Sequence, residues 1–316
     1  MRALKLPFFL PFILLLASCS KESINSEVVA TADGNHITDI QFLNDSVAIA
    51  CGGITWESAL FMKSTDGGAH WSVDYSIPAK KMNDIFFTSE GDLFMSGIDG
   101  FVCKSVDTGT SWDVTNYNVW IEVNAICMSP HSSLLLAAGP GEHVGRILKY
   151  DSTAFGFARV DTGVIANDII FLNDTLALAA VYGGVKKSID KGVEWKLSSA
   201  EGDEFIKLAG WNETHVVAIG RFGRILTSND AAATWNVLHG GNALFKPMTI
   251  VTDAEFVSEN NWILCGHNGL LWETFDSGNS FVKYSVPDEN YLSVCKKGNK
   301  IFCGTDAGKI YCFSSN

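Results

Sequence analysis

The chain contains 316 residues, of which 47% are hydrophobic and 18% are charged, and its formal net charge is −12 at pH 7. This acidic balance argues against nucleic acid as a partner, because phosphate groups require a basic surface. The length allows one or two average domains, or one larger unit if the chain is built from repeats.

The N-terminal segment predicts a secretory signal. Arg2 and Lys5 precede an apolar run over residues 6–16, which is too short to span a bilayer. Leu16-Ala17-Ser18-Cys19 follows and resembles the bacterial lipobox. We therefore expect residues 1–19 to be a lipoprotein signal peptide with lipid on Cys19, and residues 20–26 to be a polar tether. The alternative is an ordinary cleaved signal with an unmodified cysteine.

From residue 27 onward, short apolar runs alternate with turn signals, which is typical of an all-β protein. The runs recur in one order. A first run ends in a polar turn, as in DIQFLND, and a second ends in glycine, as in VAIACGG. A third run enters an aspartate motif and a short fourth run leaves it. Seven runs end in glycine, so we expect seven four-stranded units over residues 27–316.

The aspartate motif recurs at intervals of 39 to 46 residues, which is the length of one propeller blade. It occupies residues 64–71, 105–112, 188–195, 228–235 and 274–281, with a degenerate copy at Asp151. The residues that define the copies are Ser64, Asp66, Gly68, Trp71, Ser105, Asp107, Gly109, Trp112, Ser188, Asp190, Gly192, Trp195, Ser228, Asp230, Trp235, Asp276, Gly278 and Phe281.

This motif predicts a structural hairpin turn between the third and fourth strands. The carboxylate can accept backbone N–H groups, the glycines can adopt positive φ, and the closing aromatic can pack between blades. An active-site motif is the alternative, but chemistry needs one site and this pattern repeats around the chain.

The last unit ends at Asn316 without a fourth strand, and residues 27–31 can supply it. We therefore predict an all-β fold, a seven-bladed β-propeller closed by an N-terminal strand that completes the last blade. Closure would leave only short, protected sheet edges.

Seven further cysteines show no CxxC spacing, so we expect neither a zinc site nor a disulfide framework. A bridge between Cys295 and Cys303 stays open, because these residues lie on runs that would be adjacent strands. His143 and His267 would lie nearly across the ring from each other, which argues against joint metal ligation. We expect no cofactor and no metal.

The S-x-D-x-G-x-x-W spacing resembles the Asp-box, or BNR, repeat of sialidases, sortilin-type receptors and the photosystem II assembly and stability factor family. A single seven-bladed ring behind a bacterial signal is most similar to the last group, which implies a non-catalytic scaffold for other proteins. A sialidase would need three converging arginines. The mature chain has only Arg146, Arg159, Arg221 and Arg224, and none precedes the third unit, so that activity is disfavoured.

We expect ligands at the end of the propeller that carries the glycine-ended turns between second and third strands and the connections between blades. Exposed aromatic residues surrounded by polar groups are typical of a protein interface or a glycan site. The candidate residues are Trp56, Glu57, Asp99, Trp120, Glu142, His143, Tyr182, Arg221, Phe222, Phe245, His267, Asn268 and Asp306.

Two functions fit these residues. The first is a non-enzymatic, lipid-anchored protein of the bacterial cell envelope that binds a protein partner through this face; Ser20 after the cysteine resembles outer-membrane sorting. The second is a carbohydrate-binding or glycoside-hydrolase-type propeller that stacks glycans on Trp56, Trp120 and Tyr182. Glycoside hydrolysis needs two facing carboxylates, and the sequence singles out no such pair.

Overall fold

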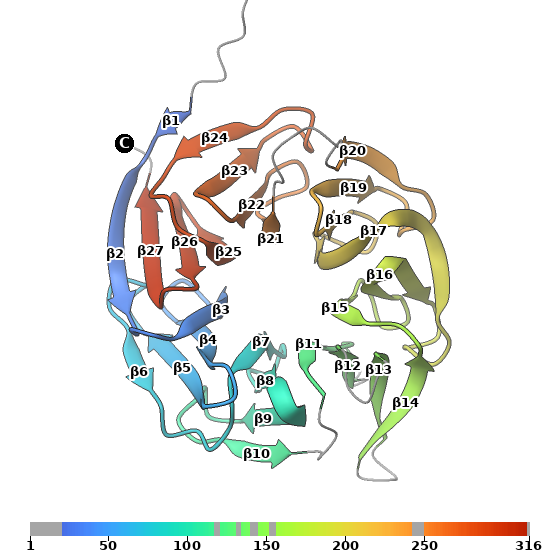
Figure 1. Cartoon of the computed structure of the whole chain (residues 1–316), viewed down its shortest axis with the longest axis horizontal. Helices are drawn as coiled ribbons and strands as arrows, with labels where there is room; N and C mark the ends of the chain where they lie inside the picture. The colour runs from blue at the N-terminus through green and yellow to red at the C-terminus, as the bar shows by residue number, and fades with distance from the viewer. Residues whose placement is uncertain are drawn as a thin grey trace, which may run out of the picture.

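A computed structural model describes residues 21–116, 121–130, 134–139, 145–151, 156–241 and 250–314. These residues form strands arranged in sheets around a common axis, and the chain runs around the resulting ring in order (Figure 1). The fold is an all-β propeller with one short 3-10 turn, η1 (Ile98–Gly100). In these residues no helix has the length and apolar character that crossing a bilayer would require.

The first three sheets are antiparallel and four-stranded. The first contains β3 (His36–Phe42), β4 (Ala48–Ile54), β5 (Ser58–Ser64) and β6 (Ser72–Asp74). The second contains β7 (Met82–Phe87), β8 (Leu93–Gly97), β9 (Phe101–Ser105) and β10 (Asp113–Asn116). The third contains β11 (Val123–Met128), β12 (Leu134–Ala138), β13 (Arg146–Asp151) and β14 (Gly156–Thr162).

The expectation of seven blades is wrong, because the described residues form six hydrogen-bonded sheets. The fourth sheet has six strands: β15 (Ala166–Phe171), β16 (Ala177–Ser188), β17 (Lys196–Gly210), β18 (Val216–Gly220), β19 (Arg224–Ser228) and β20 (Asn236–Gly240). The continuous strand β17, 15 residues long, pairs with β16 through its first part and with β18 through its second. Two of the sequence repeats therefore merge into one sheet.

The remaining sheets combine C-terminal strands with the N-terminal segment. The fifth contains β21 (Val251–Phe256), β22 (Trp262–Gly266), β23 (Leu270–Thr274) and β24 (Val282–Ser285), with β1 (Glu22–Ser23) parallel to β24. The sixth contains β25 (Tyr291–Lys297), β26 (Lys300–Thr305) and β27 (Lys309–Ser314), with β2 (Asn25–Thr31) antiparallel to β27.

Strand structure thus extends into residues 22–26, which were expected to be a tether. The physical reason is that Ile24 packs against the apolar cluster between the fifth and sixth sheets. The pairing of β2 with β27 brings an N-terminal strand and the last described strand into one sheet (Figure 1).

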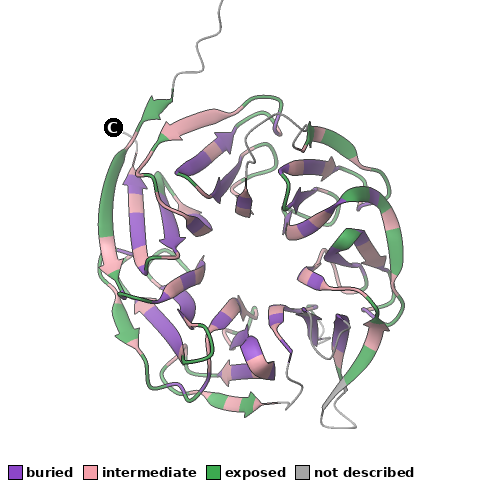
Figure 2. Ribbon diagram, viewed as in Figure 1, coloured by how far each residue is buried: buried purple, intermediate pink, exposed green. Residues whose placement is uncertain are grey.

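The innermost strands are partly buried, the second strands are the most buried, and the outermost strands are the most exposed (Figure 2). The second strands β4, β8, β18 and β22 are almost entirely buried, whereas the outer strands β6, β10 and β20 are largely exposed. Buried second strands read as continuous apolar runs because both of their faces pack against neighbouring sheets.

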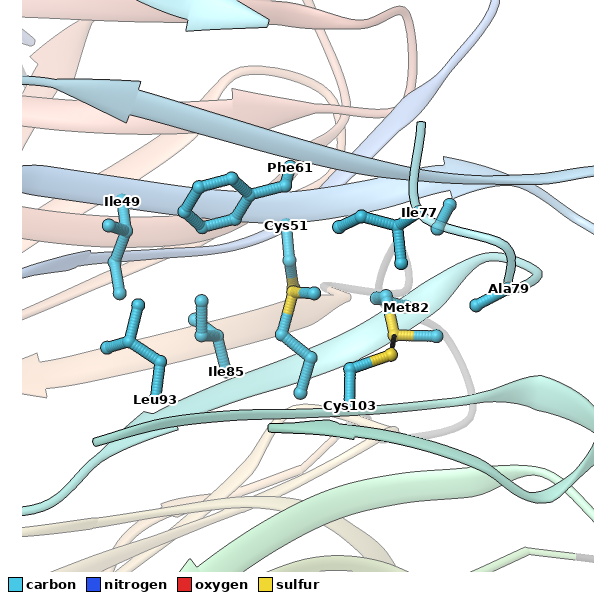
Figure 3. Packing of buried hydrophobic residues seen from close by; sticks show 11 residues of the cluster. Ile49, Cys51, Phe61, Ile77, Ala79, Met82, Ile85, Leu93 and Cys103 are labelled. Carbon is cyan, nitrogen blue, oxygen red and sulfur yellow. Dashed lines mark hydrogen bonds between the residues drawn. The ribbon is translucent and has the colours of Figure 1, made fainter. Parts of the chain in front are cut away.

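Apolar clusters fill the seams between consecutive sheets. In the seam between the first and second sheets, Phe61 and Cys51 face Met82 and Ile85 (Figure 3). The aromatic ring of Trp112, at the end of an aspartate motif, packs 5.0 Å from the Phe61 ring. Sheet-on-sheet burial of this kind supplies most of the favourable free energy of folding.

Each of the five aspartate motifs forms a turn with the same hydrogen bonds. In the first copy, Ser64 Oγ donates to Asp66 Oδ1 at 2.8 Å and accepts the Gly68 N–H at 2.9 Å. The Asp66 carboxylate also accepts the N–H groups of Ala69 and His70. The other four copies repeat this network, with Thr274 in the place of serine in the last.

The turns also dock onto the preceding sheet. A Cβ atom on Gly109 would lie 2.3 Å from the Phe61 ring, and one on Gly68 would lie 2.6 Å from the Phe302 ring. Both glycines have φ near +80°. Positive φ and close packing together explain why glycine occupies this position.

The cysteines at 51, 103, 127, 265, 295, 303 and 312 are free thiols. Cys295 and Cys303 belong to apolar clusters on opposite faces of the sixth sheet. Side chains on opposite faces of one sheet point apart, so these two residues form no bridge.

Candidate functional site

The glycine-turn end is the end of the propeller that carries the turns between second and third strands. It places several candidate side chains in solvent. The exposed fraction is 60% for Trp56, 69% for Tyr182 and 46% for Phe222. Glu57, Arg221 and Asn268 are also exposed, whereas Asp99, His267 and Asp306 are half-buried.

The six-stranded sheet brings three of these candidates together. Tyr182 lies opposite Glu204 in the β16–β17 pairing. Arg221 makes a bidentate pair with Glu204, with Nε and Nη2 at 2.7 and 3.0 Å from the two carboxylate oxygens. Phe222 follows Arg221 directly. We call Tyr182, Glu204, Arg221 and Phe222 the merged-sheet cluster.

Backbone contacts and charge hold this cluster in place. The Arg221 N–H donates to Glu204 O at 2.8 Å, and the Asp203 carboxylate accepts the N–H groups of Glu204 and Phe222. Burial raises the pKa of Asp203, although these N–H groups partly offset the rise. The hydrogen bond with Glu204 raises the pKa of Arg221. The Arg221 guanidinium therefore stays charged at neutral pH, and the two hydrogen bonds fix its orientation against Glu204.

A second group of candidates lies on the first two sheets. Trp56 adopts φ of 66° in the turn between β4 and β5, and Lys80 Nζ lies 4.9 Å from the centre of its ring. The same ammonium group pairs with Asp99 at 2.5 Å. A cation over an indole face is favourable, so Lys80 joins Trp56 to Asp99.

Asn290 links two further candidates. Its side chain donates to Asp306 Oδ2 at 2.8 Å and accepts the Asn268 N–H at 3.4 Å. The backbone N–H of His267 donates to Ile250 O, in the connection before β21. These hydrogen bonds stabilise the turns. They do not bring two carboxylates into a facing arrangement.

Five of the predicted residues lie outside the described residues: the lipid attachment residue Cys19 and the candidate face residues Trp120, Glu142, His143 and Phe245. Their part in the predicted site stays a prediction. Within the described ranges, no group of three or more His, Cys, Asp or Glu side chains is arranged to hold a metal ion.

A polar ring surrounds the axis, and none of its residues was among the predicted site residues. The innermost strands of consecutive repeats do not pair with each other, so side chains satisfy their backbone groups. Asp84 accepts the Ile126 N–H at 2.8 Å, and Asp168 accepts the Leu208 N–H at 2.7 Å. Asp39 and Asp253 make the equivalent bonds to Ile85 and Val294.

Lys207 lies among these four aspartates, beside a narrow axial pocket of about 130 Å³. Its ammonium group is 3.2 Å from Asp253 Oδ1, an ion pair without hydrogen-bond geometry. Burial alone would lower the pKa of Lys207, but the charges of Asp253 and the other three aspartates outweigh it and hold the pKa well above its usual value.

Aligned sequence runs carry a signal for this ring. The aspartates occupy the first position of DIQF, DIFF, DIIF and DAEF, and Lys207 occupies the same position in KLAG. A lysine at the position of a repeated aspartate is a charge reversal, and it supplies the cation of the ring.

Neither a protein-family model nor a curated relative matches the sequence. Solved propellers do match the fold. A YCF48 structure with a bound D1 peptide is 14% identical, covers 93% of this chain and 96% of its own, and has a TM-score of 0.70. YCF48 from Cyanidioschyzon merolae is 13% identical, covers 92% and 98%, and has a TM-score of 0.68.

A virginiamycin B lyase from Staphylococcus aureus is 10% identical, covers 93% of this chain and 99% of its own, and has a TM-score of 0.72. The similar structures therefore include a peptide-bound protein and a lyase. At these identities the likeness establishes the β-propeller fold alone.

Proposed function

We propose that this chain is a non-catalytic binding protein of the bacterial cell envelope that holds a protein partner at its glycine-turn end. The observation that carries the proposal is the merged-sheet cluster. Two exposed rings belong to it, Tyr182 opposite Glu204 and Phe222 next to Arg221, and Glu204 already orients the arginine. Aromatic residues and arginine supply most of the energy at protein interfaces, and a preoriented side chain loses less entropy on binding.

The comparisons support a protein partner in general terms, because YCF48 has been solved with a peptide on a similar ring. The envelope location rests on the sequence alone, on the signal-like segment that ends at Cys19 and on the Asp-box resemblance. Substituting Cys19→Ser tests the anchor. The full chain should move from the membrane fraction to the soluble fraction and lose labelling by a fatty-acid probe, and unchanged labelling would contradict lipidation.

Quantitative capture from detergent-solubilised membranes of the native host tests the binding role. The full chain should recover one protein in near-stoichiometric amount. The double variant Tyr182→Ala/Phe222→Ala should recover at least tenfold less of it, with a melting temperature close to that of the native chain.

Trp211→Ala is the matched control, because Trp211 is 45% exposed and lies on the same sheet, in the turn after β17 at the opposite end. This variant should capture the partner normally. Equal losses in both variants would contradict the assigned surface. Absence of any captured protein, together with saturable binding on a glycan array, would favour the carbohydrate alternative.

A further inference from the structure

Among the described residues, no closing aromatic of an aspartate motif packs into the seam between the second and third sheets. Where an intact motif borders a seam, its closing aromatic packs there, as Trp112 does between the first and second sheets and Trp195 between the third and fourth. The apolar cluster between the second and third sheets contains no such ring. The reason lies in the sequence, since the degenerate copy at Asp151 has Gly156 where the other copies have tryptophan or phenylalanine.

A pocket of about 770 Å³ opens at this seam, at the end of the ring that carries the aspartate motifs. That volume is within the range of small-molecule and side-chain binding sites. Its apolar lining includes Phe94, Val102 and Leu134, which come from β8, β9 and β12. The pocket therefore lies where a seam bordered by an intact motif holds a ring from the chain itself.

Acidic side chains surround the apolar floor. Glu90, Asp92 and Asp113 line the pocket, and Lys104 is the one basic residue among its described lining. The Lys104 ammonium group pairs with Asp92 at 2.9 Å and lies 5.4 Å from the centre of the Phe94 ring. This pairing neutralises one carboxylate, so Glu90 and Asp113 leave the rim negative.

We propose that this seam pocket binds an aromatic side chain of a partner protein, flanked by lysine or arginine. The ring would occupy the position that Trp112 occupies one seam earlier, where it packs 5.0 Å from Phe61. The flanking cations would face Glu90 and Asp113. This site goes beyond the proposed function, because it lies at the opposite end of the ring from the merged-sheet cluster and does not depend on it.

A defined probe tests the pocket without the natural partner. The peptide N-acetyl-Lys-Trp-Lys-amide, carrying 5-fluorotryptophan, is titrated with the full chain and followed by fluorine NMR. Saturable binding is expected, with at least fivefold weaker binding of the Glu-Trp-Glu and Lys-Ala-Lys peptides, the latter measured by competition. Equal binding of the Glu-Trp-Glu peptide, or no saturation, would overturn the proposal.

Two variants locate the binding. Thr115→Trp places a ring in the pocket from the exposed outer strand β10, and Glu90→Lys reverses a rim charge. Each should weaken binding at least fivefold. The controls are Val237→Trp, which adds the same ring to the exposed outer strand β20, and Glu259→Lys, which makes the same charge change in the equivalent turn of the fifth sheet. Both controls should bind within twofold of the native chain.

A further variant distinguishes a partner's side chain from one of this chain. Residues 152–155 follow β13 in the sequence and include Phe155. Comparable peptide binding in the native chain and in Phe155→Ala supports a site for a partner. Binding that emerges only in Phe155→Ala would overturn the proposal, because the chain would then fill its own pocket.

Discussion

The two ends of the ring differ in how far they repeat. At one end, five aspartate turns use the same serine or threonine and carboxylate hydrogen bonds, although the residues between them vary. At the glycine-turn end, each turn is built differently: Trp56 lies beneath Lys80, Arg221 pairs with Glu204, and Asn290 joins Asn268 to Asp306. The repeated turns stabilise the fold, and the irregular turns carry the residues of the merged-sheet cluster.

This difference shows where to look for function in a repeat protein. A feature that recurs in the repeats has a structural role common to them, such as closing a hairpin or filling a seam. The merged sheet and the unplugged seam are exceptions to the repeat, and both candidate sites coincide with them. Four predictions test this contrast.

The largest effect is expected at the axis between the two ends. Lys207→Met removes the cation that compensates four aspartates, and loss of one partner of a buried ion pair costs 3–5 kcal/mol. Because water reaches Lys207 from the axial pocket, where its side chain is 26% exposed, we expect about 3 kcal/mol. Chemical denaturation measures this value. Lys196→Met, at an exposed outer position, should change stability by less than about 0.5 kcal/mol.

The aspartate-turn end should be sensitive to an added methyl group. Gly109→Ala strains a φ of +81° and forces a Cβ atom into the Phe61 ring, so we expect a loss of about 2 kcal/mol. Gly91→Ala is the control, since Gly91 has φ of +93° but no neighbour within 4 Å and should lose about 1 kcal/mol. Equal losses would mean that docking of the turn adds nothing.

A smaller difference in stability is expected between substitutions of two tryptophans that occupy the same motif position. Trp195 Nε1 donates to Gly192 O at 3.1 Å, whereas the buried Trp112 Nε1 finds no hydrogen-bond partner among the described residues. Trp195→Phe should therefore cost about 1 kcal/mol, and Trp112→Phe should cost less because it removes an unsatisfied donor. Urea denaturation curves of the two variants decide the order, and a larger loss for Trp112→Phe would contradict it.

The smallest effect is a pH dependence at the same end. Hydrogen bonds from the residue four positions later, and then from the serine or threonine, lower the pKa of the turn aspartates, to about 2 for Asp230. A lowered folded-state pKa stabilises the protein above the ordinary pKa, and this contribution is lost as pH falls through the folded-state value.

Asp230→Asn should therefore reduce the fall in melting temperature between pH 4 and pH 2. Calorimetry at several pH values provides the measurement, and Asp33→Asn, in an exposed turn outside the aspartate motifs, is the control. The same fall in Asp230→Asn and in the native chain would contradict the assigned stabilisation.

Much of the architecture could be predicted from the sequence, because strand runs, glycine turns and aspartate motifs recur in order. The number of sheets could not. The connection from β6 to β7 contains Pro78, which lacks the N–H that a strand needs, whereas residues 196–210 contain no proline and continue as one strand. The merger of two repeats depends on this continuity, which a count of glycine-ended runs does not detect.

The candidate site was predictable only in part. Tyr182, Arg221 and Phe222 follow apolar runs at glycine turns, so the pattern identifies them. Glu204 lies within β17, away from any turn signal, and its role depends on the pairing of β16 with β17. The seam pocket likewise depends on how the second and third sheets pack against each other. The degenerate motif at Asp151 does not by itself indicate a pocket.

The central claim is that the irregular end of the ring binds the partner. Amide hydrogen exchange of the full chain, alone and bound to the protein that it captures, tests this most directly. The account predicts protection at residues 182–184, 203–204 and 221–223, with no change at the five aspartate turns. Protection confined to those turns, with residues 182 and 221–223 unaffected, would contradict it.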